Sequence, residues 1–72
     1  MLSIYRDNEG RVYQTECHEG GFVIAAYDRY GYRVSREWIG SNRTHVQNVL
    51  DRMADKRQWR WIGCQGKRSR RA

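Results

Sequence analysis

The sequence predicts an α+β fold, in which an antiparallel sheet of four strands, with a fifth as an option, is covered by one α-helix. Three observations lead to this fold. Apolar residues recur with helical spacing only in residues 41–63, whereas residues 2–38 form short strand-like segments separated by glycine-containing turns. A chain of 72 residues is also too short for more than one small core. We therefore expect one domain over residues 1–65 and a flexible, disordered basic tail over residues 66–72.

Four segments in the first part of the chain are typical of strands. Leu2–Arg6 alternates in polarity, and Arg11–Cys17 follows it after a turn. Phe22–Tyr27 is the most apolar run in the chain, which favours a central place in the sheet. Tyr32–Trp38 is the fourth expected strand, and Ile39 and Gly40 end it.

Two of the connections share one turn sequence. Residues 7–10 and residues 28–31 both follow the pattern Asp-x-x-Gly, and strand-like residues come directly after each. The pattern predicts two hairpins with similar turn chemistry. Gly10 and Gly31 are expected to adopt the left-handed backbone conformation that favours glycine.

The helix is expected after Ser41, with Ser41 or Thr44 as its N-cap. Thr44 and Gln47 match a capping box, in which the Gln47 side chain would reach back to the N-cap amide. Six residues recur on one helical face: Val46, Val49, Leu50, Met53, Ala54 and Arg57. After the helix, residues 59–62 can add the fifth strand. The expected core combines apolar residues of the strands and the helix: Leu2, Ile4, Val12, Phe22, Ile24, Ala26, Val34, Val46, Val49, Leu50 and Met53, with at least one of Trp59 and Trp61.

The positive charge is concentrated at the C-terminal end. The net charge is +6, yet residues 1–55 contain seven arginines and eight acidic residues, a balance of −1. Residues 56–72 contain seven basic residues and no acidic one, a balance of +7. Such segments attract phosphates and release counterions on binding, so the asymmetry favours nucleic acid as a partner.

The first group of candidate binding residues lies in the tail, which carries Lys67, Arg68, Arg70 and Arg71. These residues would bind phosphates, or they would only make the terminus soluble. The second group is Trp59, Arg60 and Trp61. In a strand both indoles would point to one face, where they would either stack on unpaired bases or fill the core. Burial is the outcome we expect, above all for Trp61.

The third group lies at the second turn, where Arg29 and Arg33 flank Tyr30. Hairpin residues of this kind enter the major groove in β-ribbon proteins, and the alternative is an ordinary solvated turn. A three-stranded sheet followed by a covering helix is also similar in element order to AP2-like and integrase arm-binding domains. The similarity is one of layout, and no motif of those families occurs in the chain.

Metal binding and catalysis have little support in the sequence. Cys17, His18, His45 and Cys64 are the residues that a zinc site would use, but their spacing matches no zinc motif. A Cys17–Cys64 disulfide is the other alternative, which an intracellular compartment would disfavour. Cys17, His18 and Glu19 are adjacent, and neighbouring strand residues face opposite sides, so they cannot form a nucleophile–base pair. We expect no metal, no cofactor and no enzymatic activity.

The sequence therefore favours a small basic nucleic-acid-binding accessory protein, of the kind that phages and mobile elements encode, with DNA and RNA not distinguished. The alternative is a small protein-binding inhibitor, for example of a host defence complex, that acts through its sheet edge or aromatic surface. A membrane-spanning apolar run and a signal-peptide pattern are both missing from the sequence. We expect a cytoplasmic monomer or homodimer without membrane contact.

Overall fold

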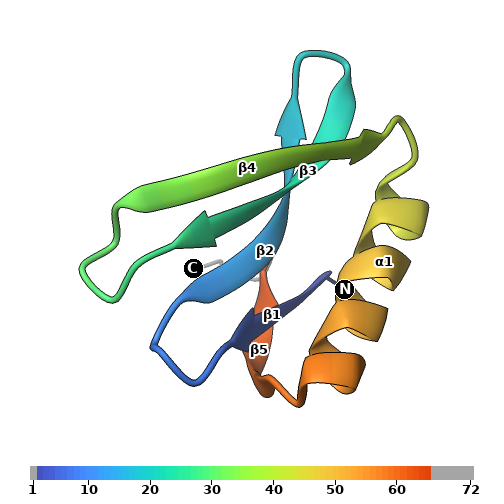
Figure 1. Ribbon diagram of the computed structural model, residues 1–72. Coiled ribbons are helices and arrows are strands. Elements are labelled where there is room, and N and C mark those ends of the chain that lie inside the picture. Colours follow the sequence, from blue (N-terminus) through green and yellow to red (C-terminus); the bar gives the residue numbers. More distant parts are fainter. Residues whose placement is uncertain (1, 66–72) are drawn as a thin grey trace, which may run out of the picture.

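The alternating segments form strands and the helical stretch forms one helix, so the predicted α+β fold is confirmed (Figure 1). The computed structural model describes residues 2–65, without the side chains of Trp38 and Ile39. The predicted disordered tail, residues 66–72, lies outside the described residues. In chain order the elements are β1 (Leu2–Arg6), β2 (Val12–His18), β3 (Gly21–Tyr27), β4 (Arg33–Gly40), α1 (Arg43–Arg57) and β5 (Arg60–Gln65).

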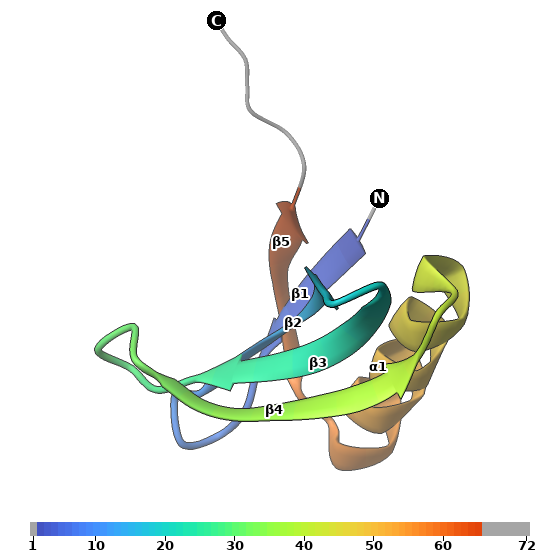
Figure 2. The same cartoon turned by 90° about the horizontal axis from the view of Figure 1, so that it is seen from above.

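The five strands form one antiparallel sheet in the order β4-β3-β2-β1-β5. The optional fifth strand is present, and it extends past Ile62, where the sequence predicted it to end, as far as Gln65. The apolar β3 has a neighbour on each side, although β2 holds the middle place. The sheet is strongly twisted, and α1 lies on one side of it (Figure 2).

The two Asp-x-x-Gly turns match bond for bond. The Asp7 carbonyl accepts from the N–H of Gly10 at 3.2 Å, and the Asp28 carbonyl accepts from that of Gly31 at 3.0 Å. Each aspartate Oδ1 also accepts two backbone N–H groups, those of residues 9 and 11 in the first turn and of residues 30 and 32 in the second. Gly10 and Gly31 have φ values of +88° and +92°. The predicted turn chemistry is confirmed.

These φ values predict similar costs for two glycine substitutions. Gly10→Ala and Gly31→Ala should each lower the free energy of unfolding by about 1 kcal/mol, because an added Cβ is strained in the left-handed region. Space is not the cause: the Cβ at position 31 would meet nothing within 4 Å, and that at position 10 would lie 3.6 Å from the Arg29 Cβ. Thermal melts of both variants beside wild type measure the loss. Two unchanged melting temperatures would contradict the strain argument.

Most of the core lies between the sheet and α1, but Val23 and Ala25, which alternate with Ile24 along β3, are also buried on the opposite face. Ile24, Val46 and Leu50 are buried at the centre of the core. Partly buried side chains surround them: Tyr5, Tyr13, Phe22, Val49, Met53 and Trp59. Val34, which the sequence placed in the core, is 48% exposed, so this prediction is wrong. The pairing of β3 with β4 shifts between Ala26 and Tyr27, which leaves Val34 without a partner on β3, and β4 is an edge strand.

The helix begins differently from the prediction. Asn42 is the N-cap, and its side chain accepts a hydrogen bond from the His45 N–H at 3.0 Å, so neither Ser41 nor Thr44 caps the helix. Gln47 forms no capping box, because its side chain points into the protein and is only 6% exposed. Within the described residues, α1 is too short and too polar to span a bilayer.

Gln47 bridges a split in the sheet. Among the described residues, β1 pairs with β2 only through Tyr5–Tyr13 and Arg6–Val12, and the two strands then diverge (Figure 1). The Gln47 amide accepts from the Thr15 hydroxyl at 2.8 Å and donates to the Ser3 carbonyl at 3.2 Å. It also donates to Asp51, which accepts from the Tyr5 hydroxyl. Gln65 adds a bond to the Thr15 carbonyl.

Candidate nucleic-acid interface

The pairing register determines which side chains face away from the helix. Tyr5 and Thr15 lie on the helix side, since they contact Asp51 and Gln47 of α1. Successive strand residues alternate between the two faces, so Arg6 and Val12 lie on the opposite face. This opposite face has no helix over it in the described structure.

A row of paired residues crosses all five strands on that face. Arg60 pairs with Arg6, Arg6 with Val12, Val12 with Tyr27, and Tyr27 with Arg33. Arg36 lies farther along β4 on the same face, where it pairs with Ala25. Arginines therefore occupy both edges and the interior of this face.

The two hairpin turns border a depression beside the middle of the row. Its volume is about 740 Å³, and Arg6, Val12 and Tyr27 of the row line it together with Arg29 from the second turn. The Arg29 guanidinium donates to the Glu9 carbonyl at 3.3 Å, which joins the two turns. We call the residues Arg6, Arg29, Arg33, Arg36 and Arg60 the arginine face.

The carboxylates near the arginine face are occupied by other partners. Asp7 and Asp28 accept the turn N–H groups, and Glu9 lies 3.6 Å from Arg11. Glu16 accepts hydrogen bonds from the Tyr27 hydroxyl and the Gln14 amide. Among the described residues, no arginine of the arginine face has a carboxylate within 4.0 Å. Arg29 donates to the Glu9 carbonyl and Arg36 Nη1 lies 3.4 Å from His18 Nδ1, but none of these described contacts neutralises the charge of the arginine face.

The pKa shifts of Asp7 and Tyr27 agree with these hydrogen bonds. Partial burial alone would raise the pKa of Asp7, but hydrogen bonds from the Arg11 N–H, the Tyr13 hydroxyl and the Glu9 N–H outweigh it and lower that pKa. The hydrogen bond to Glu16 raises the pKa of Tyr27, and burial adds to the effect. The Asp7 carboxylate therefore stays charged and bound within its turn down to a lower pH than a free aspartate.

Arg6 and Arg60 are direct cross-strand neighbours. Like charges in this position destabilise a sheet, because the side chains lie close together. Both also line a pocket of about 270 Å³ with Asp7, Asn8 and Gln58, so one carboxylate lies at the same pocket as the two arginines. A bound anion would relieve this repulsion.

Three of the predicted arginines, Arg29, Arg33 and Arg60, thus come together on one face. Sequence reasoning missed Arg6 and Arg36. The alternation of faces within each of their strands could be predicted from the sequence. The pairing of β1 with β5 and the shift in the pairing of β4 with β3 could not. The other predicted phosphate-binding residues, Lys67, Arg68, Arg70 and Arg71, lie outside the described residues.

The two indoles at the β5 end have different environments. Trp59 packs against the core and stacks on Tyr13, with ring centroids 4.0 Å apart and an interplanar angle of 12°. Trp61 pairs with Tyr5 and therefore lies on the helix side of the sheet, but at its edge, where it is 58% exposed. The expected burial of Trp61 is wrong, because α1 covers the position of Trp59 and leaves the edge strand open. The structure brings neither indole to the arginine face.

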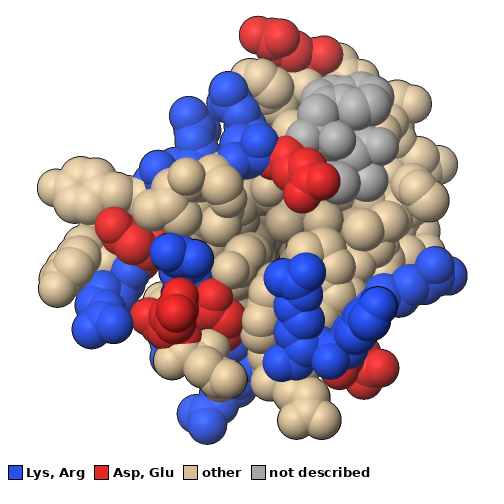
Figure 3. Space-filling view, in the orientation of Figure 1, with Lys and Arg blue, Asp and Glu red and all other residues tan. Residues whose placement is uncertain are grey.

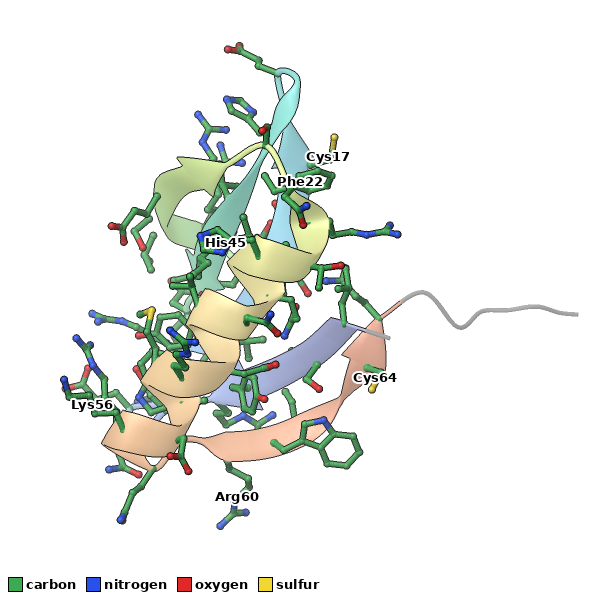
Figure 4. All side chains as sticks on the ribbon, turned by 90° about the vertical axis from the view of Figure 1, so that its right-hand side faces the viewer. Cys17, Phe22, His45, Lys56, Arg60 and Cys64 are labelled. Atoms are coloured by element: carbon green, nitrogen blue, oxygen red, sulfur yellow. The ribbon has the colours of Figure 1, made fainter. Side chains whose placement is uncertain are left out.

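The residues considered for zinc are dispersed. Figure 4 shows Cys17 beside Phe22 at one end of the sheet, Cys64 on β5 and His45 on α1. Both thiols are free. Within residues 2–65 no group of three or more potential metal ligands comes together.

Charges are mixed over the surface. Figure 3 shows basic side chains over the hairpin turns and β4 on the left of the view and over α1 on the lower right, with acidic groups near both. The arginine face is therefore defined by the availability of its cations and not by an absence of acids.

No protein-family description matches the chain, and neither a curated protein nor a solved structure is significantly similar to it.

Proposed function

We propose that this protein binds nucleic acid through the arginine face. The observation that supports the proposal is the row from Arg60 to Arg33, which crosses every strand on the face that α1 leaves open. Adjacent strands lie about 4.8 Å apart, so the row spans about 19 Å. A polyanion can contact several cations over that length, whereas a small anion would contact one or two.

The chemistry of the row suits phosphodiesters. The guanidinium group is always charged and presents its donors in a fork that matches two phosphate oxygens. The occupied carboxylates Asp7, Glu9 and Glu16 do not neutralise these arginines. The basic residues from Lys67 onward would add to the same electrostatic attraction.

The proposal predicts that binding depends on where the arginines lie and not only on the net charge. Arg33→Gln/Arg36→Gln should weaken binding and flatten the slope of log K against log salt by up to about 1.8 units on duplex and about 1.4 on single strands. The matched control is Arg43→Gln/Arg52→Gln, which removes the same charge from exposed positions on α1. Fluorescence anisotropy salt titrations with a duplex and a single strand of equal length measure both slopes.

Two results would contradict this proposal. Equal losses from the two double variants would show that only net charge matters. If the wild-type protein bound neither probe at about 50 mM salt, nucleic acid would be excluded as the ligand.

A protein partner is the second candidate function, and the edge strand β4 supports it. Residues 33–37 of β4 are all exposed, and Val34 presents an apolar side chain there. An edge strand offers unpaired backbone groups to which an extended segment can add. In that case the arginines would contact acidic side chains of the partner, and the protein would act as an inhibitor by covering a surface.

A further inference from the structure

We propose that Tyr30 and Tyr32, at the tip of the β3–β4 hairpin, stack on unpaired bases, so that the nucleic acid on the arginine face is single-stranded. This inference rests on the proposed function and specifies the class of ligand. The two rings are 77% and 73% exposed, which makes them the most exposed large hydrophobic side chains among the described residues. The sequence offered Trp59 and Trp61 as the alternative stacking residues, although it favoured their burial.

The turn does not need aromatic side chains at these positions. Tyr30 and Tyr32 contribute backbone groups to it: both N–H groups donate to Asp28 Oδ1 at 2.9 Å, and the Tyr32 carbonyl accepts from the Asp28 N–H at 2.8 Å. The first turn has the same hydrogen bonds, with Glu9 and Arg11 at the equivalent positions. Those charged side chains form an exposed ion pair, as expected for a solvated turn. The first turn therefore forms without aromatic side chains at these positions. The aromatic rings of the second turn have no structural role in that turn.

The position of the rings relates them to the arginine face. The β3–β4 turn projects away from α1, on the side of the molecule opposite the helix (Figures 1 and 2). Arg29 precedes Tyr30 and Arg33 follows Tyr32, and residues 29–36 contain no acidic residue. A strand whose phosphates contact Arg29 and Arg33 would therefore place its bases beside the two rings.

Stacking selects for unpaired bases. In a duplex the faces of the bases are covered by their neighbours, whereas a single strand can turn each base onto an aromatic side chain. Such stacking strengthens binding by about 5- to 150-fold per base and tolerates any sequence. Arginines supply the attraction to the backbone, and the tyrosines supply the preference for single strands.

The test compares Tyr30→Ser/Tyr32→Ser with Tyr30→Phe/Tyr32→Phe on two probes, labelled oligothymidine and a duplex of the same length. The serine pair should weaken oligothymidine binding at least tenfold and change duplex binding less than twofold. The phenylalanine pair keeps the rings and should bind as wild type does. The salt slope should be the same for all three proteins, because no charge changes. Melting temperatures confirm that each variant is folded.

Three outcomes would overturn the inference while the proposed function stands. The serine pair could bind oligothymidine as tightly as wild type, or lose duplex affinity to the same extent, which would indicate groove insertion. The phenylalanine pair could lose as much as the serine pair, which would assign the effect to the hydroxyl groups. Failure of the proposed function gives a different result, in which the wild-type protein binds neither probe.

Discussion

Replacing Gln47 by leucine is expected to lower the free energy of unfolding by about 3 kcal/mol. Leucine fills a similar volume but offers no partner to the Thr15 hydroxyl or the Ser3 carbonyl, both of which bond to Gln47 where β1 and β2 separate. Each buried polar group left unpaired costs about 1–3 kcal/mol. Asp51 would keep its bond from Tyr5 but lose the one from Gln47.

The matched control for this substitution is Asn48→Leu, which makes the same kind of change at the next, exposed position of α1. Urea unfolding of the two variants and wild type measures the difference. We expect Asn48→Leu to stay within about 0.5 kcal/mol of wild type. Equal stabilities of the two variants would mean that the hydrogen bonds of Gln47 contribute nothing net to the fold.

Trp59→Ala is expected to lower the free energy of unfolding by about 3–5 kcal/mol, whereas Trp61→Ala should lower it by about 1 kcal/mol or less. Trp59 packs against the core and stacks on Tyr13, so its removal leaves a cavity between α1 and β2. Trp61 is exposed at the edge and loses few contacts. Native domains have only about 5–15 kcal/mol to lose, so Trp59→Ala should remove a large part of the stability and lower the melting temperature by at least about 12 °C.

Thermal melts followed by far-UV circular dichroism separate the two tryptophan variants. Tyrosine fluorescence gives an independent readout, because removal of Trp59 frees Tyr13 from its stacked neighbour. If Trp61→Ala proved the more damaging variant, the edge position of β5 would be wrong.

Local sequence patterns were sufficient to predict the elements and the turns. The Asp-x-x-Gly repeat specifies its own hydrogen bonds within five residues, and the helical spacing from Val46 to Ala54 selects one face. Features that depend on distant residues were not predictable. Gln47 has the sequence pattern of a capping box, but it is drawn inward because β1 and β2 diverge, and that divergence leaves Thr15 and Ser3 in need of partners.

The candidate site, too, was predictable only where it does not depend on distant residues. Arg29, Arg33 and Arg60 were identified from charge alone. Arg6 joins this face through the pairing of β1 with β2, and Arg60 lies beside it because β5 pairs with β1. The exposure of Trp61 depends on how far α1 reaches across the sheet, and the exposure of Val34 depends on a shift in strand pairing. Neither is a property of the residues themselves.

The pairing of β5 with β1 also has a consequence for how the chain reaches its folded state. Ser3 meets Cys64 and Leu2 meets Gln65, so the largest sequence separations in the described chain occur in one ladder. Closing so long a loop costs entropy before any contact in the ladder forms. During synthesis the β2–β3–β4 meander and α1 can assemble while one edge of β1 remains unpaired. β5, which follows α1 in the chain, then completes the described sheet, and with it the five-strand row of the arginine face.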